Sequence, residues 1–441
     1  MRPLAEIEGC FQGVIPSYIA TASASGEANV TAVSIIHLLS PTRVGVSCQF
    51  MNKTIQNLRE TGRARLLALE PSTLADYVIH ARFERLVDSG PVFERMRATL
   101  EGIASQSGMS GVFSLAGVVE LEVLDWHAAV IGAAETVPHQ TTARDPLESV
   151  ERISAAMSEA PDLDGLLEVT FSAIHAQLGL SHGFLLLADG SGERLYNVAS
   201  HGFEHAHFGA EIAVGEGIYG TSAARRVPIR TGSMRRDRMM TAAIARETAQ
   251  PDPTHLALPG LADVESSLAI PLVKNDRCVG VLCFQSARSG VFTAACETTL
   301  LIVARHLAAT IATVGAAPKD VEVSAKRGPL GGRALALHVK YFEADGSVFL
   351  DGEYLIKGVA GRILWRVLSN FASENRDEFS SKEIRLDPEV GLPALKDNLE
   401  TRLIALRKRL EERTTSMRIE KTGRGRFRLE VTRELVLERR P

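Results

Sequence analysis

Arginine, asparagine and threonine side chains recur at helical spacing near the C-terminal end of the 441-residue chain. In the segment 393–412, Asn398, Arg402 and Arg409 fall on one face of a predicted helix, and Thr401 lies beside them. A helix fits the major groove of B-DNA, where arginine and asparagine make paired hydrogen bonds to guanine and adenine edges. The spacing therefore predicts a helix that reads bases in double-stranded DNA.

Further basic residues surround this helix. Lys396 and Lys408 are placed to meet phosphates, and the turn Gly423-Arg424-Gly425-Arg426 is a compact basic loop suited to the minor groove or the backbone. A solvated basic surface or a protein interface remains the alternative. The residues expected to contact DNA are Lys396, Asn398, Thr401, Arg402, Lys408, Arg409, Arg424 and Arg426.

A second polar group lies at 52–57, at the start of a short predicted helix. Asn52 suits the N-cap and Gly62 suits the C-terminal stop, while Lys53 and Asn57 share a face. A helix N-terminus offers unpaired N–H groups, and Lys53 adds a positive charge, so the group is suited to a phosphate. The alternative is that these residues form the solvated face of a short helix.

Other reactive residue types form no clear site. His201, His205 and His207 have spacing that a metal or haem could use, but a polar loop is favoured, and we expect no metal site. Cys278 and Cys283 are five residues apart, so on one strand they should point to opposite faces as free buried thiols. We see no catalytic triad or carboxylate pair and expect no enzyme.

Composition supports a soluble protein with several domains. The length predicts two to four domains, and 45% hydrophobic with 23% charged residues is typical of globular chains. The net charge is −4, but residues 333–441 carry 22 basic and 18 acidic side chains, so only this end is basic (+4 against −8 for the rest). Five scattered cysteines exclude a disulfide framework. We expect a cytoplasmic protein, because the start carries Glu6 and Glu8 and the apolar stretch 300–317 contains Arg305.

Two stretches rich in small and polar residues read as linkers. They divide the chain into the predicted segments 1–131, 132–147 (linker), 148–314, 315–333 (linker) and 334–441. The first segment has strand-like alternation, including one strand over 29–39. The second combines helical stripes with a hairpin at Asn275-Asp276. The third ends in helices and a strand pair, with a leucine stripe and a capping box at Ser380 and Glu383.

The first segment resembles the FMN-binding split barrel of the pyridoxamine 5'-phosphate oxidase-like superfamily over residues 10–130. The resemblance rests on strand order and on FMNKTIQNL at 50–58, similar to an element that helps to hold the flavin phosphate. The end of the segment, Leu124-Asp125-Trp126-His127, lacks the basic substrate motif of genuine oxidases, so vitamin oxidase activity is not expected. The resemblance implies FMN as cofactor, held by Ser34, Gln49, Asn52, Lys53, Thr54 and Asn57.

The middle segment looks like a GAF domain. GEGIYG at 215–220 and VPI at 227–229, together with SLAIPLV at 267–273, carry the likeness. GAF domains cover one face of an antiparallel sheet with helices and leave a pocket on the other. Members bind small effectors or only dimerise, and the signature of cyclic-nucleotide binders is absent, because Lys274-Asn275-Asp276 is an ordinary turn.

The last segment resembles the winged helix-turn-helix output domain of response regulators over about 347–432. DNLETRLIALRKRL at 397–410 and IEKTGRGRFRL at 419–429 are close to that family's recognition helix and wing. Ala405 stands where the family usually has arginine, so base contacts do not carry over residue by residue. No receiver domain accompanies it, which places the input in the two upstream segments.

The sequence thus predicts a multidomain α+β chain: an antiparallel split β-barrel, a GAF α/β sandwich with an antiparallel sheet, and a C-terminal winged helix. The expected function is a one-component transcriptional regulator, a homodimer whose first two domains sense a flavin, a redox state or a small-molecule effector. Two alternatives stay open. One is a flavin-dependent oxidoreductase with regulatory domains, and the other is a ligand-free dimerisation scaffold.

Overall fold

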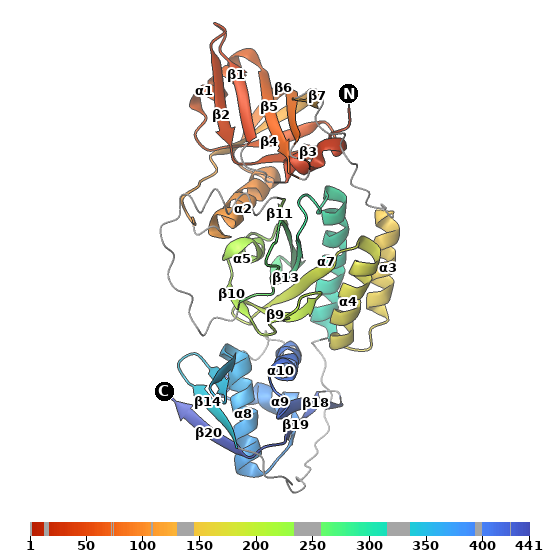
Figure 1. Cartoon of the computed structure of the whole chain (residues 1–441), viewed down its shortest axis with the longest axis vertical. Coiled ribbons are helices and arrows are strands. Elements are labelled where there is room, and N and C mark those ends of the chain that lie inside the picture. Colours follow the sequence, from red (N-terminus) through yellow and green to blue (C-terminus); the bar gives the residue numbers. More distant parts are fainter. Residues whose placement is uncertain are drawn as a thin grey trace.

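The structure is a computed structural model of the chain, and it describes residues 2–12, 17–71, 73, 75–106, 109–129, 145–232, 257–314, 336–392, 399–423 and 425–441. Three units follow one another along the long axis of the molecule (Figure 1). We call residues 2–129 the N-terminal unit, 145–314 the middle unit and 336–441 the C-terminal unit. The predicted linkers fall almost entirely outside the described residues.

The N-terminal unit is built on a 7-stranded antiparallel sheet with the order β2-β1-β5-β6-β7-β4-β3. Its inward-facing aliphatic residues, such as Ile19, Ile79 and Leu121, form one apolar core. The elements are η1 (Leu4–Phe11), β1 (Ser17–Ala22), β2 (Ala28–Val33), β3 (Ile36–Ser40), β4 (Arg43–Cys48), α1 (Asn52–Thr61), β5 (Arg63–Glu70), β6 (Ala75–Val87), α2 (Pro91–Gln106) and β7 (Gly117–Ala128).

The single strand predicted over 29–39 is in fact two strands, β2 and β3, which lie at opposite ends of the sheet order. The break falls at Ser34-Ile35, where the Ile35 amide donates to Ser47 Oγ and its carbonyl accepts from the Ser47 amide, both at 3.0 Å. Because Ile35 is fully buried, this local bonding satisfies its backbone outside the main sheet pairing.

The N-cap residue of helix α1 lies one position earlier than the sequence predicted. Met51, not Asn52, is the N-cap residue, and no side chain accepts a hydrogen bond from the first turn. The C-terminal end is as predicted, with Gly62 in the left-handed conformation at φ +67°. The first-turn N–H groups of α1 are therefore not capped by a side chain.

The middle unit is a 6-stranded antiparallel sheet with the order β10-β9-β8-β13-β12-β11. Side chains of α3, α4 and α7 form an apolar core on one face, and α5 packs on the other. Its elements are α3 (Pro146–Ser158), α4 (Leu163–Leu178), β8 (His182–Ala188), β9 (Arg194–His201), β10 (Glu211–Ala213), α5 (Gly217–Arg225), β11 (Ile229–Thr231), β12 (Ser266–Lys274), β13 (Arg277–Ser286) and α7 (Ala294–Val314).

One local prediction for this unit is confirmed. Asn275 and Asp276 both have positive φ, 49° and 57°, as the tight turn between β12 and β13 requires. One prediction is wrong: Cys278 and Cys283 both pack on the α5 side of the sheet. A bulge between Leu272 and Val273 adds a residue to β13 and reverses the side of Cys278. Burial raises the pKa of both thiols.

Among the described residues, one stretch, Ala294–Ile311 of α7, has the length and hydropathy that a membrane span would need. Leu300, Val303, Leu307 and Ile311 of this helix are buried in the apolar core of the middle unit. Its hydropathy is therefore explained by packing on the sheet.

The C-terminal unit combines helices with a 4-stranded sheet of order β16-β15-β14-β20 and a 3-stranded sheet of order β17-β19-β18. Residues 347–356 form a hairpin that turns at Asp351-Gly352, where φ is +49° and +89°. The elements are β14 (Leu337–Phe342), β15 (Ser347–Leu350), β16 (Glu353–Ile356), α8 (Gly358–Glu374), β17 (Glu378–Ser380), α9 (Ser381–Leu386), α10 (Leu399–Arg413), β18 (Met417–Gly423), β19 (Arg426–Val431) and β20 (Leu435–Arg440).

Both sequence signals for the helices of this unit are confirmed. Ser380 caps α9 by accepting a hydrogen bond from the Glu383 amide at 3.2 Å. The leucine stripe of α10, from Leu399 to Leu410, faces the apolar core of this unit, where it packs with α8 and the hairpin β18–β19. The opposite face of α10 is thereby directed away from its own unit.

A buried ion network joins the N-terminal and middle units. Arg230 on β11 is 2% exposed and lies 3.0 Å from Glu8 and 3.4 Å from Glu297, and it donates to the Phe292 carbonyl at 2.8 Å. Glu297 also pairs with Arg95 of α2. Because charges are costly to bury unless they are paired, this network fixes the two units relative to each other.

Candidate functional site

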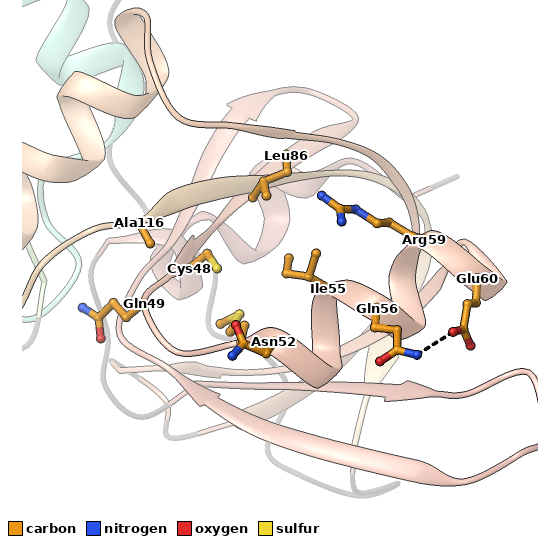
Figure 2. A pocket seen from close by; sticks show the side chains of 10 residues that line it. Cys48, Gln49, Asn52, Ile55, Gln56, Arg59, Glu60, Leu86 and Ala116 are labelled. Carbon is orange, nitrogen blue, oxygen red and sulfur yellow. Dashed lines mark hydrogen bonds between the residues drawn. The ribbon is translucent and has the colours of Figure 1, made fainter.

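The first candidate site is a cavity of about 490 Å³ beside α1 in the N-terminal unit (Figure 2). Its volume lies in the range of ligand pockets, roughly 300–1,000 Å³. Residues of β4, α1 and β6 contribute side chains to it. The lining residues are Cys48, Gln49, Met51, Asn52, Ile55, Gln56, Arg59, Glu60, Leu86 and Ala116.

A smaller hollow of about 200 Å³ adjoins the cavity, and Gln49 and Met51 line both. Ser34 also lines the hollow and donates a hydrogen bond to Gln49 Oε1 at 3.4 Å. Gln49 Nε2 is buried and has no hydrogen-bond partner within the described part of the chain. A buried donor without a partner is costly, so this amide is suited to a polar group that enters the cavity.

Of the six residues that the split-barrel resemblance assigns to FMN, the structure brings Ser34, Gln49 and Asn52 to these cavities. The other three line neither of them. Lys53 is half-exposed and pairs with Glu27.

The remaining two, Thr54 and Asn57, are buried under the sheet and hold α1 against it. Thr54 shares a 2.8 Å hydrogen bond with Thr31, and the Asn57 amide donates to Thr21 at 3.1 Å.

Arg59 is the cationic lining residue, and it was not among the predicted FMN contacts. It follows Asn52 and Gln56 at intervals of four and three residues, so the three side chains form one stripe of α1 facing the cavity. That spacing was the available signal. In Figure 2 the Arg59 side chain points toward Leu86, and Gln56 donates a hydrogen bond to Glu60 at 2.8 Å. The cavity thus carries a guanidinium and a carboxylate, and burial raises the pKa of the Cys48 thiol, which favours its neutral form.

These residues fit a flavin mononucleotide. The volume of the cavity is adequate, and Gln49 supplies a buried donor. Asn52 supplies a polar contact at the uncapped start of α1, and Arg59 supplies a cationic contact farther along the same helix. Glu60 is the one feature that opposes an anionic ligand. The site can therefore bind a polar or phosphorylated ring ligand.

The second candidate site is the outer face of α10, which is not open to solvent. Thr401, Arg402 and Arg409 are 0%, 2% and 4% exposed. The expectation that this face lies open is wrong, because the middle unit covers Thr401 and Arg402 and the C-terminal unit itself covers Arg409. Ile404 and Ala405 of α10 join the apolar core of the middle unit.

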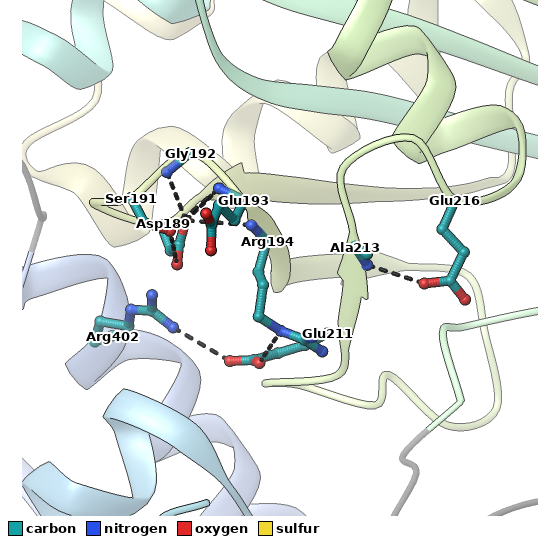
Figure 3. A network of polar contacts seen from close by, with 9 residues as sticks. All are labelled: Asp189, Ser191, Gly192, Glu193, Arg194, Glu211, Ala213, Glu216 and Arg402. Carbon is teal, nitrogen blue, oxygen red and sulfur yellow. Dashed lines mark hydrogen bonds and ion pairs between the residues drawn. The ribbon is translucent and has the colours of Figure 1, made fainter.

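Polar contacts fix the same face. Thr401 Oγ1 and the Tyr196 hydroxyl share a hydrogen bond of 2.6 Å. The Arg402 guanidinium lies 3.5 Å from the Tyr196 ring centroid and 3.5 Å from Glu211 (Figure 3). Glu211 in turn accepts from Arg194 at 2.9 Å.

The flanking basic residues are paired as well. Lys408 and Arg407 both contact Asp164, Lys408 at 3.2 Å, and Lys421 of β18 contacts Asp162 at 2.7 Å. Arg409 stays within its own unit and donates to the Leu355 carbonyl at 2.9 Å, while burial lowers the pKa of its guanidinium.

Of the other predicted DNA contacts, Arg426 is partly buried at the start of β19, and its neighbour in register is Ser380. Lys396, Asn398 and Arg424 lie outside the described residues.

The three clustered histidines of the sequence divide between two groups. His201 stacks on Phe171 at 6.2 Å and lies 5.7 Å from His175, whereas His205 and His207 stack on each other at 5.9 Å. Nowhere in the described ranges do three histidine, cysteine or carboxylate side chains group as metal ligands would.

Comparison with solved structures finds likenesses to parts of the chain. An FMN-binding protein from Syntrophomonas wolfei is 15% identical over 29% of this chain and 86% of its own, with a TM-score of 0.26. A putative pyridoxamine 5'-phosphate oxidase from Lactobacillus delbrueckii is 17% identical over 29% and 100%, with a TM-score of 0.23. The GAF domain of a phosphoenolpyruvate-protein phosphotransferase from Coxiella burnetii is 22% identical over 38% and 93%, with a TM-score of 0.30. At these values the likenesses carry no argument.

The comparison with curated proteins found no match. Residues 160–312 match the family model of the GAF domain, which spans nearly the whole middle unit. The sheet of the N-terminal unit has the antiparallel order described above. The chain is therefore a multidomain α+β protein in which a 7-stranded antiparallel sheet precedes a GAF domain.

Proposed function

We propose that this chain is a one-component transcriptional regulator that binds double-stranded DNA through its C-terminal unit. The observation that carries the proposal is the arrangement of α10. This basic helix packs by its leucine stripe on α8, α9 and β18 and is followed at once by the β18–β19 hairpin. A helix backed in this way and followed by a two-stranded ribbon supports the winged helix-turn-helix that the sequence predicts.

The proposed roles follow from side-chain chemistry. Arg402 reads base edges with Thr401 beside it, and Lys408 contacts phosphates, as does Arg407. Arg424 and Arg426 belong to the wing. The chain acts as a cytoplasmic homodimer, since two half-sites are the usual target of such a domain. We assign it no catalytic residue.

The input is proposed to be a small ligand or redox state. GAF domains sense small effectors, and the cavity of the N-terminal unit is proposed to hold FMN through Gln49, Asn52 and Arg59. A bound flavin would supply a group that accepts or donates electrons. The chain's own residues would orient it: Gln49 by its buried amide, and Arg59 by its charge.

Flavin binding is tested by replacing Arg59 with alanine. Losing a charge-assisted hydrogen bond costs about 1.5–3 kcal/mol, so we expect at least about tenfold weaker FMN binding. Titration of the apoprotein with FMN, followed by flavin fluorescence, measures this. Lys53→Ala is the matched control, because Lys53 pairs with Glu27 and lines neither cavity. Equal losses in both variants would place the phosphate at the Lys53 end of the helix instead.

A flavin-dependent oxidoreductase remains a second candidate, favoured by the buried donor of Gln49 beside an open cavity. It is distinguished by steady turnover of reduced nicotinamide by the FMN-loaded protein. The regulator is expected to show none above the rate of free FMN.

DNA binding is tested by selecting duplexes from a random pool with the purified chain at low salt. We expect an enriched sequence whose affinity falls steeply as salt rises, because phosphate contacts release counterions. Recovery of random sequence only, with no dependence on salt, by a chain whose α10 is accessible would reject the proposed function.

A further inference from the structure

The face of α10 that should read DNA is occupied by the GAF domain. We call this contact the α10 contact and define it by Thr401, Arg402, Arg407 and Lys408 on one side, and Tyr196, Glu211 and Asp164 on the other. Thr401 and Arg402 are essentially inaccessible to solvent within it.

The partners of α10 offer negative charge and an aromatic ring, two features that nucleic acid also offers. Asp164 pairs with Lys408, which is proposed to contact phosphates, and Glu211 pairs with Arg402, which is proposed to read base edges. Asp162 pairs with Lys421 in the hairpin. The Tyr196 ring stacks on the flat Arg402 guanidinium. The middle unit therefore presents negative charge and an aromatic face to the surface that DNA needs.

The two occupants exclude each other. Ile404 and Ala405 sit in the apolar core of the middle unit, so the helix lies too close to β9 and α4 for a duplex to enter between them. Glu211 is held in place by Arg194 from the opposite side, which keeps its carboxylate aimed at Arg402 (Figure 3).

We propose that the GAF domain is a built-in competitor of DNA for α10, so that the structure described here is the closed form and DNA binding requires release of the α10 contact. The inference rests on the proposed function. In this proposal the GAF domain, which is proposed to sense the ligand, blocks α10 from DNA both by occupying its space and by pairing with its charges.

The strands of the GAF domain offer a route from its ligand to the α10 contact. Glu211 of β10 and Tyr196 of β9 are neighbours in register, as are Ile212 and Leu195 one residue on. Because side chains alternate along a strand, Leu195 and Ile212 face the apolar cluster on the α5 side with Phe184 and Tyr219. A ligand that repacks this cluster shifts the same two strands that hold α10.

The test reverses charge on the GAF side and leaves the C-terminal unit unchanged. The release variant is Asp164→Lys/Glu211→Lys. The control is Glu148→Lys/Glu151→Lys on α3, which changes the net charge by the same amount at exposed positions outside the α10 contact. Fluorescence anisotropy with the selected duplex gives the Kd, and hydrogen exchange of α10 amides reports whether the contact has opened.

We expect faster exchange in α10 and a Kd at least about tenfold lower for the release variant, with little change for the control, because opening raises the fraction of competent protein. A release variant that exchanges faster but binds DNA no better than the control would overturn the proposal. If neither the wild-type chain nor the release variant binds any duplex, although hydrogen exchange shows that α10 has opened in the variant, the proposed function fails instead.

A second readout uses the wild-type chain and does not depend on the variant. Coupling is reciprocal, so saturating duplex should speed exchange at Tyr196 and Glu211 in β9 and β10. Binding of DNA with unchanged exchange at these two strands would show that α10 stays docked, and the proposal would be wrong.

Discussion

Replacing Arg230 with methionine is expected to lower the free energy of unfolding by about 3 kcal/mol, at the low end of the cost of breaking a buried ion pair. The change leaves Glu8 and Glu297 without their shared cation, although Glu297 keeps Arg95. Urea unfolding followed by Trp126 fluorescence in a Trp365→Phe background measures the loss, because the chain has only these two tryptophans.

Arg225→Met is the matched control for this prediction. Arg225 pairs with Glu101 at 2.8 Å across the same junction of the N-terminal and middle units, but its side chain is 37% exposed. An exposed pair contributes about 0–1 kcal/mol, so the control should lose little. Equal losses for the two arginines would mean that burial does not set the strength of this junction.

Replacing Arg402 with alanine in the release variant is expected to weaken binding of the selected duplex by about 1–3 kcal/mol and to relax preference at one base position. The release background matters because Arg402 is otherwise held by Tyr196 and Glu211. Anisotropy with the selected duplex and with single-base variants of it measures both effects.

Arg418→Ala serves as the control for Arg402. Arg418 is an exposed arginine of β18 that pairs with Glu420 and Glu430 and has no proposed DNA contact. Its loss should change affinity only slightly and equally on all sequences. A variant at Arg402 that keeps full base preference would remove this residue from the reading surface.

Local features of the fold were predictable because their causes are local. The capping of α9 by Ser380, the turn at Asn275-Asp276 and the leucine stripe of α10 each depend on residues a few positions apart. The bulge that moves Cys278 to the other side of its strand left no such pattern, because it depends on pairing with the neighbouring strand.

The candidate sites were predictable only in part, for the same reason. The split-barrel resemblance was enough to predict Asn52 at the cavity, and helical spacing would have been enough for Arg59. Neither depends on residues far along the chain. Helical spacing could not show that Thr401 is bonded to Tyr196, 205 residues earlier in the chain. A basic helical face looks the same in sequence whether it meets phosphate or carboxylate, so only the packing of the units identifies its present partner.

The central claim is that the C-terminal unit binds duplex DNA through α10. Its most direct measurement is the Kd of the release variant for a duplex across a range of salt concentrations. We expect specific binding, and we expect the logarithm of the association constant to fall linearly with the logarithm of the salt concentration. The slope should reflect several phosphate contacts. Absence of salt-dependent binding to every duplex, in a variant whose α10 amides exchange freely, would contradict it.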